Sequence, residues 1–257
     1  MMNSNLQIAI EAARAAGKII MEGYATQNSV DVKENKSQVT ETDKNSEKDI
    51  IQILEAKSKF PILAEETRNI PSNTDSYWVV DPLDGTTNFI RRIPLCAVSI
   101  ALIENNTPTV GVIFNPITGE MFYAQKGGGA FLDGERIYCS KESGILFANS
   151  GYDKKHKDAF AQVVIATTDY SIRKFGTTAY ELATVARGGA DAFVAWGDEL
   201  WDHAAGILLV RESGGIVTNW KNEEWNTSSK FVLAGNKQMQ AGLVSIVGRI
   251  SNELNYE

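Results

Sequence analysis

Five strand-like runs separated by short turns constrain the fold of this chain more than any other feature. Apolar, β-branched and aromatic residues gather in runs that cover 77–80, 96–103, 109–114, 121–125 and 130–132. The last four are separated by Asn105-Asn106, by residues 115–119 and by Gly127-Gly128-Gly129, all typical turn sequences. Turns this short join neighbouring antiparallel strands. The first half of the chain therefore predicts a largely antiparallel sheet.

Two helices are expected beside that sheet. Apolar residues recur at three- and four-residue steps in the first segment, at Leu6, Ala9, Ile10, Ala13, Ala16 and Ile20. A second helix is expected from a cap at Thr40 or Thr42, with Asp43 near its positive end, to about Ala56. Residues 27–40 predict a loop or a mobile strand pair, and 62–64 a short strand. Residues 1–140 are thus predicted to form an N-terminal α+β lobe.

The pattern changes to alternating strands and helices after about residue 143. Strands are predicted at 145–148, 163–166, 192–195, 216–218 and 231–234. Helices are predicted at 177–187, 201–211 and 237–250, and Gly188-Gly189 and Gly214-Gly215 end the first two. Residues 141–257 are therefore predicted to form a C-terminal α/β lobe in one compact unit with the first.

Composition excludes several classes of protein. The net charge of −7 argues against non-specific binding to nucleic acid or to an anionic membrane. No apolar run reaches the roughly 18 residues that span a bilayer. The first residues lack the features of a secretion signal, so a cytoplasmic location is expected. Two cysteines, Cys96 and Cys139, predict reduced thiols, and with two histidines they make a structural zinc site improbable.

The segment Trp78–Phe89 carries the clearest chemical signal. An apolar strand delivers Asp81 at its end, and Asp84 follows three residues later, so the two carboxylates can converge. Pro82 restricts the turn, and Gly85 permits close backbone approach. Thr86 and Thr87 then offer hydroxyl and N–H groups at a helix or turn start, which suits an anion. Two acids beside a phosphate cradle are typical of a Mg²⁺ site, although a turn in which both acids cap backbone groups remains the alternative.

Three further acids lie at element ends. Glu65 ends its short strand, and Asp202 stands in the first turn of an apolar helix. Each has a simpler interpretation: Glu65 as a solvated acid, Asp202 and Asp43 as residues favoured by a helix N-terminus. Their joint occurrence beside Gly and Thr residues indicates a site.

These segments together resemble the inositol monophosphatase family of Mg²⁺-dependent, lithium-sensitive phosphatases. The resemblance runs from about Ala9 to Asn236 and is carried by Glu65-Glu66, Asp81–Phe89, Trp201–Gly206 and Glu212–Gly215. It implies a five-layered αβαβα sandwich, commonly dimeric, that hydrolyses phosphate monoesters.

The resemblance also implies roles for single residues. Glu65, Asp81 and the Leu83 carbonyl would hold a first metal, Asp81, Asp84 and Asp202 a second, and Glu65 would contribute to a weaker third. Asp43 and Thr86 would orient and deprotonate the attacking water, and the Gly85 and Thr86 N–H groups would bind phosphate. Asp84, Thr87, Gly176 and Thr177 complete the predicted substrate-binding set.

Charge supports the metal prediction independently. The four carboxylates of Glu65, Asp81, Asp84 and Asp202 sum to −4 when ionised. Two Mg²⁺ ions bring the net charge of the site to about zero and three bring it to about +2, so a dianionic phosphate can bind. Two metals also stabilise both the attacking and the leaving oxygen, so we expect direct attack by water without a phosphoenzyme.

Weaker features have simpler interpretations. Gly127–Gly129 is predicted to be a hairpin turn rather than a phosphate loop. His203 is interpreted as a residue of the helix flank, Trp201 as a packing residue, and His156 as part of a charged loop. In inositol-specific relatives an acid a few residues before the Trp-Asp pair receives substrate hydroxyls. Here Ala195 stands at that position, and Asp198 or Glu199 is the candidate replacement.

The sequence thus predicts a cytoplasmic, homodimeric phosphatase that uses two or three Mg²⁺ ions on small sugar or polyol monophosphates. Inositol 1-phosphate is the default substrate. Histidinol phosphate, fructose 1,6-bisphosphate and 3′-phosphoadenosine phosphates are alternatives that the motifs do not separate. A regulatory binding protein that kept the fold is the alternative from another class. Such a protein has no need of all five acids, and no nucleic-acid partner is expected.

Overall fold

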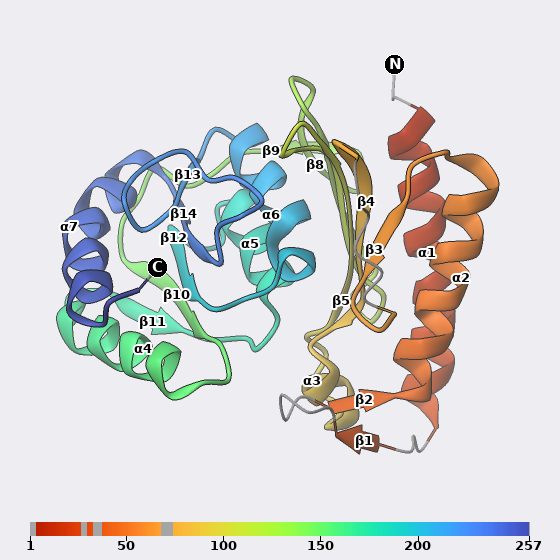
Figure 1. Ribbon diagram of the computed structural model, residues 1–257, viewed down its shortest axis with the longest axis horizontal. Helices are drawn as coiled ribbons and strands as arrows, with labels where there is room; N and C mark the ends of the chain where they lie inside the picture. The colour runs from red at the N-terminus through yellow and green to blue at the C-terminus, as the bar shows by residue number, and fades with distance from the viewer. Residues whose placement is uncertain (1–3, 27–29, 33–37, 68–73, 257) are drawn as a thin grey trace.

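Helices and sheets alternate in five layers in the computed structural model, which describes residues 4–26, 30–32, 38–67 and 74–256 (Figure 1). Helices α1 (Ser4–Ala25) and α2 (Glu41–Lys57) form one outer layer. A seven-stranded sheet follows, then α5 (Thr178–Ala186) and α6 (Leu200–Glu212), then a five-stranded sheet. Helices α4 (Lys154–Ala166) and α7 (Lys237–Glu253) form the other outer layer. The predicted αβαβα sandwich is confirmed.

The seven-stranded sheet runs in chain order and is antiparallel except between its first two strands. Its strands are β3 (Ile62–Ala64), β4 (Ser76–Asp84), β5 (Ala97–Glu104), β6 (Thr107–Asn115), β7 (Glu120–Gln125), β8 (Gly129–Leu132) and β9 (Glu135–Ile137). This agrees with the antiparallel sheet predicted from the turn spacing. Gly127 and Gly128 lie between the paired strands β7 and β8, and Gly129 begins β8, as a hairpin turn requires.

The five-stranded sheet has the order β11-β10-β12-β14-β13. Its strands are β10 (Ile145–Ser150), β11 (Ser171–Arg173), β12 (Ala192–Trp196), β13 (Ile216–Thr218) and β14 (Phe231–Gly235). β10 pairs in parallel with β11 and β12, whereas β14 is antiparallel to β12 and β13.

The predicted strand at 163–166 is wrong, because these residues end helix α4. The apolar run Val163–Ala166 resembles a strand, yet Ala159 and Val163 are buried and Ile165 is 74% exposed, which is helical spacing. Asp153 caps the helix by accepting the N–H of His156 at 2.7 Å. His156 is therefore in the first turn of a helix and not in a loop, which corrects the second prediction for this region.

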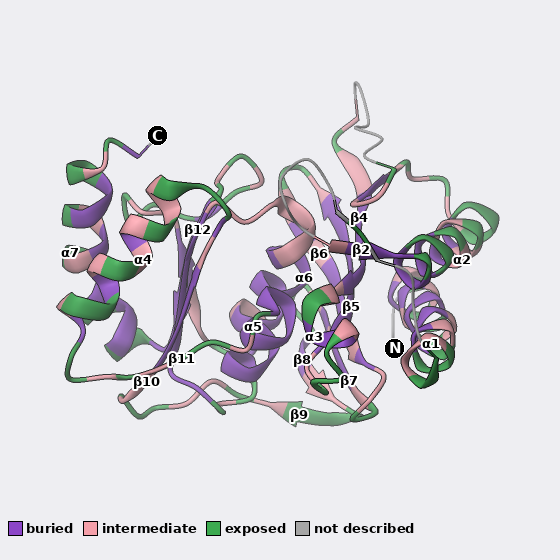
Figure 2. Cartoon of the chain, turned by 90° about the horizontal axis from the view of Figure 1, so that it is seen from below, coloured by how far each residue is buried: buried purple, intermediate pink, exposed green. Residues whose placement is uncertain are grey.

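The central helices pack closely because glycine stands at two contacts. A Cβ at Gly111 on β6 would lie 2.9 Å from the carbonyl oxygen of Ala205, and one at Gly206 would lie 2.5 Å from Leu182. In Figure 2, α5 and α6 are almost wholly buried, while the four outer helices each keep an exposed face. Helix α6 therefore needs apolar residues on all sides, as its sequence has.

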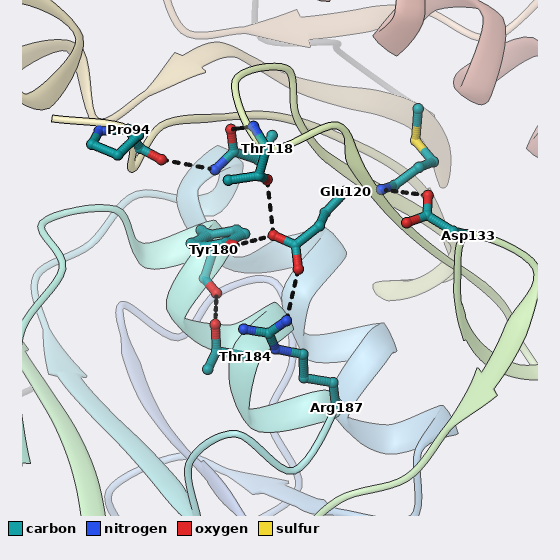
Figure 3. Close-up of polar contacts among 9 residues, drawn as sticks. Pro94, Thr118, Glu120, Asp133, Tyr180, Thr184 and Arg187 are labelled. Atoms are coloured by element: carbon teal, nitrogen blue, oxygen red, sulfur yellow. Dashed lines mark hydrogen bonds and ion pairs between the residues drawn. The ribbon is translucent and has the colours of Figure 1, made fainter. Parts of the chain in front are cut away.

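A polar network fastens α5 to the first sheet. Glu120 on β7 accepts hydrogen bonds from the Tyr180 hydroxyl and from Arg187 Nη1, the latter at 2.7 Å (Figure 3). Thr184 Oγ1 donates to the Tyr180 carbonyl at 2.8 Å. Tyr180 and Arg187 thus hold the helix that carries residues 178–181 beside β7.

Three short elements complete the described chain. β1 (Val30–Val32) pairs antiparallel with β2 (Gln38–Thr40), so of the two forms expected for 27–40 the described residues form the strand pair; 27–29 and 33–37 lie outside the description. Helix α3 (Thr86–Ile90) follows β4. Across the described ranges, no helix has the length and apolar character needed to cross a bilayer.

Candidate metal and phosphate site

A β-bulge at the end of β4 brings its two acids to one side. Asp81 pairs with Ser99 and Asp84 with Ala97, so β4 has one residue more than β5 over this interval. Residues three apart on a regular strand point to opposite faces, and the extra residue removes that alternation. Pro82 fits the bulge because it has no N–H to pair. Asp81 accepts the Leu83 N–H at 2.9 Å, which closes the turn.

Gly85 links this strand to helix α3. It has φ 86°, and a Cβ there would lie 2.9 Å from the Leu95 carbonyl oxygen, so glycine is required. Thr86 and Thr87 begin the helix, and the Thr87 hydroxyl donates to Gln38 at 3.1 Å. The first turn of α3 therefore lies directly after the end of β4.

Glu65 and Asp202 reach the same place from other elements. Glu65 directly follows β3, and its N–H donates to the Val80 carbonyl at 3.1 Å, one residue before Asp81. Asp202 is in the first turn of α6, where its carboxylate accepts the Glu199 N–H at 2.7 Å. Asp202 therefore takes part in capping α6, as its simpler interpretation expects.

One cavity of about 540 Å³ joins these residues. Of the residues predicted to bind metal or substrate, its wall includes Glu65, Asp81, Leu83, Asp84, Gly85, Thr86, Thr87, Gly176 and Asp202. Thr177 is buried behind the wall, and its hydroxyl donates to Asp84 Oδ2 at 2.6 Å. Asp43 also lies behind it, in contact with Thr86. Acids separated by more than 100 positions in the sequence thus share one cavity.

Asp43 has two partners that use different oxygens. Its Oδ2 accepts the Thr40 N–H at 2.8 Å, which caps α2, and its Oδ1 accepts the Thr86 hydroxyl at 2.9 Å. Burial raises the pKa of Asp43 to about 6, although the hydrogen bonds from Thr40 and Thr86 act in the opposite direction. The carboxyl can therefore change protonation state near neutral pH.

Three acids of the cavity, Asp81, Asp84 and Asp202, have raised pKa values. Burial is the largest cause for Asp81, followed by the charges of Glu65, Asp84 and Asp202, and its pKa lies well above the usual range. Asp202 behaves likewise. Burial raises the pKa of Asp84 to about 7 against the hydrogen bonds from Thr177 and Ala179. Crowded carboxylates of this kind are stabilised as anions by cations.

The donor set fits a hard divalent cation. Four carboxylates and the Leu83 carbonyl supply only oxygen ligands, the kind that Mg²⁺ prefers. Within the ranges that the structure describes, no three of these acids form a ready-made metal cluster. The fit therefore rests on the chemistry of the donors and on their shared cavity.

Two cavity residues that the sequence did not indicate are Asn149 and Thr178. Asp198 also lines the cavity and accepts the Thr178 hydroxyl at 2.8 Å, whereas Ala195 is fully buried and does not reach the wall. Asp198 and Glu199, the two candidate replacements for the acid expected at position 195, thus both line the cavity.

The histidines have different positions. His156 lines the cavity, and a Cβ at Gly197 would lie 2.1 Å from its ring, so Gly197 leaves room for it. His203 is buried with its ring 5.3 Å from that of Trp225, and burial lowers its pKa to about 3. In the described part of the chain neither ring nitrogen of His203 has a hydrogen-bond partner, so it is a core residue. Trp201 lines the cavity and also packs against the central core.

The fold and this cavity define an αβαβα sandwich with an acidic, oxygen-rich site. The profile of the inositol monophosphatase family matches residues 1–252, so the chain belongs to that family. It is 37% identical to the inositol monophosphatase of Dictyostelium discoideum in an alignment that covers 91% of this chain and 92% of that protein.

Two further relatives support the same family membership. The chain is 35% identical to the Nus factor SuhB of Escherichia coli K12 in an alignment that covers 98% of this chain and 99% of that protein. The structure of the Thermotoga maritima IMPase matches with a TM-score of 0.88 at 30% identity, covering 98% of this chain and all of that one. Family members therefore carry both enzyme and Nus-factor names.

Proposed function

We propose that this protein is a Mg²⁺-dependent phosphomonoesterase that hydrolyses small sugar or polyol phosphates, with inositol 1-phosphate as the default substrate. One observation carries the proposal: Glu65, Asp81, Asp84 and Asp202, from three separate parts of the fold, line one cavity beside the start of α3. A cavity this acidic repels a phosphate dianion unless divalent cations reverse its charge.

The metal ligands follow from this arrangement. Glu65, Asp81 and the Leu83 carbonyl would hold one Mg²⁺, and Asp81, Asp84 and Asp202 a second, with Glu65 available to a third. When bound, the ions would polarise the phosphoryl group and stabilise charge on the attacking and leaving oxygens.

Thr86 and Asp43 would accept the proton that the attacking water loses. The Thr86 hydroxyl donates to Asp43 Oδ1 at 2.9 Å, so its oxygen keeps a lone pair for a proton from the attacking water. Thr86 can accept that proton while passing its own to Asp43. A base with a pKa of about 6 is deprotonated at neutral pH and ready for this step.

The backbone of Gly85, Thr86 and Thr87 would orient the phosphate. These N–H groups stand at the start of α3 on the cavity wall, where helix geometry leaves them without helical acceptors. The oxygen of water attacks phosphorus, the ester P–O bond breaks, and the leaving alkoxide takes a proton from solvent water, while Asp43 returns the proton it received to solvent. Cys96 is an unsuitable nucleophile because burial raises its pKa to about 12. We propose direct attack by water.

The remaining wall would bind the organic part of the substrate. Glu199 Oε1 and Lys230 Nζ form an ion pair at 2.9 Å, so their charges cancel. Asp198 and Lys174 also lie in this wall and are opposite in charge. A nearly neutral wall with a carboxylate suits an uncharged polyol, and Asp198 is our candidate acceptor for its hydroxyl groups.

The other substrates remain candidates and are separated by direct assay. Purified, metal-stripped protein would be tested with and without Mg²⁺ on inositol 1-phosphate, histidinol phosphate, fructose 1,6-bisphosphate and 3′-phosphoadenosine 5′-phosphate. Release of inorganic phosphate only with Mg²⁺, and fastest from the inositol ester, is expected. Failure to hydrolyse any phosphate ester under these conditions would contradict the proposed function.

A regulatory role is the second candidate, favoured by the 35% identity to a protein named a Nus factor over almost its whole length. The five acids Asp43, Glu65, Asp81, Asp84 and Asp202 argue for catalysis, since a binding protein does not need them. The net charge of −7 still predicts no direct contact with nucleic acid. We further propose a cytoplasmic homodimer that lithium inhibits by taking one metal position.

A further inference from the structure

Both backbone polar groups of Phe175 are held by side chains from different layers. Its carbonyl accepts a hydrogen bond from Asn88 Nδ2 at 2.7 Å, and Asn88 follows the metal-site turn on α3. Its N–H donates to Oε1 of Glu181, which lies on the central helix α5. The segment between β11 and α5 is therefore fixed from both sides.

Glu181 makes three hydrogen bonds although it is fully buried. Its Oε1 accepts the Gly176 N–H at 3.1 Å as well as that of Phe175, and its Oε2 accepts from Asn149 Nδ2. Burying a carboxyl group is costly unless its hydrogen bonds are satisfied, and here the partners are mainly backbone groups of one segment. None of the roles proposed above uses this side chain.

The held segment leads directly to Asp84. After Gly176, Thr177 caps α5 and donates its hydroxyl to Asp84 Oδ2 at 2.6 Å. The Ala179 N–H donates to the same oxygen at 2.7 Å. Thr177 and Ala179 thus orient one oxygen of Asp84. Both residues follow closely on Phe175 and Gly176, whose backbone is held in place.

We infer that Glu181 is a positioning residue that, by holding the backbone of Phe175 and Gly176, sets Thr177 and Ala179 against Asp84 and so orients this carboxylate toward a divalent cation. The inference rests on the proposed function. Partners behind a metal ligand typically change metal affinity or activity by about 10- to 100-fold when lost.

The test compares two substitutions at position 181. Glu181→Met keeps the volume but removes the acceptor, and we expect the Mg²⁺ dissociation constant of the full chain, measured by titration calorimetry, to rise by about 10-fold. Glu181→Gln keeps an oxygen for both N–H groups, so its Mg²⁺ affinity should return to within about threefold of the original protein.

Tyr180→Phe is the matched control. It deletes the hydroxyl that fastens α5 to Glu120 (Figure 3) but leaves residues 175–177 in place. We expect a lower melting temperature with unchanged Mg²⁺ affinity, which separates loss of stability from loss of orientation. If Glu181→Met does not fold, Asn88→Ala releases the Phe175 carbonyl instead, and the same rise in the dissociation constant is expected.

The outcomes distinguish the two levels of the proposal. The inference alone is overturned if the folded Glu181→Met variant binds Mg²⁺ as tightly as the original protein. If Glu181→Met does not fold, unchanged Mg²⁺ affinity in Asn88→Ala overturns it instead. Equal losses in Glu181→Met and Glu181→Gln also overturn it, because acceptor geometry would then not matter. No Mg²⁺ binding by the original protein overturns the proposed function itself.

Discussion

The hydroxyl oxygen of Thr86 lies 2.9 Å from Oδ1 of Asp43, which joins residues 43 positions apart at the edge of the acidic cavity. Asp43 also caps helix α2 through its second oxygen, which Thr40 uses. The capping and catalytic interpretations of Asp43 are therefore compatible, because each needs a different oxygen. The cap fixes the carboxyl group in the orientation that Thr86 requires.

This pair predicts a defined pH dependence. Because the pKa of Asp43 is raised to about 6, the carboxylate that accepts the proton is present above that value and is lost as the pH falls through it. At saturating Mg²⁺, kcat should fall about tenfold per pH unit below 6. Asp43→Asn should lower kcat by about 100- to 10 000-fold with little change in KM. If the residual activity of Asp43→Asn still falls in the same way below pH 6, this fall must be due to another group.

Asp84→Asn should have opposite effects on activity and on stability. Loss of one charged metal ligand should lower kcat/KM by about 100- to 1000-fold. Without metal the variant should melt at a higher temperature than the original protein above pH 7. The reason is that the pKa of Asp84 is raised to about 7, so ionisation of this buried carboxyl group destabilises the folded protein as the pH rises through that value. Asparagine does not ionise and so avoids this loss.

Scanning calorimetry with EDTA and with Mg²⁺ measures the stability effect. The original protein should gain stability on adding Mg²⁺, and Asp84→Asn should gain much less. A near-normal turnover rate for Asp84→Asn would remove this residue from the site.

Asp198 should govern the choice of organic group. Asp198→Asn weakens acceptance of substrate hydroxyls, so KM for inositol 1-phosphate should rise by about 10-fold. Hydrolysis of p-nitrophenyl phosphate, which has no polyol hydroxyls, should change little. Equal losses on both substrates would place Asp198 in the chemical step instead.

Glu181 predicts a pH dependence of stability. Burial raises its pKa to about 8 from the usual 4.5, so the folded protein holds a proton there that the unfolded chain releases. The stability contributed by this group is full below about 4.5 and is lost as the pH rises through 8. Between pH 6 and 9 the melting temperature of Glu181→Gln should therefore fall less steeply than that of the original protein. Parallel slopes would contradict this.

Local patterns were sufficient for most of the fold and part of the site. Turn residues at hairpin spacing predicted the antiparallel sheet, and the motif at Asp81 and Asp84 predicted acids at a strand end. The run Val163–Ala166 was misread because four apolar residues suit either a strand or a helix. Only the spacing of Ala159 from Val163 separates the two possibilities. Asn149 and Thr178 had no local signal, because nothing in the neighbouring sequence shows that they line a cavity.

The amino-acid sequence by itself determined which segments form helices and strands and which acids end them, because periodicity, caps and turns act between residues close in the chain. Tertiary structure alone decided that a bulge turns Asp81 and Asp84 to one side, that Asp198 and not Ala195 reaches the cavity, and that Glu181 holds the backbone behind Asp84. These relationships join residues on different layers. They depend on how sheets and helices pack, which no short stretch of sequence contains.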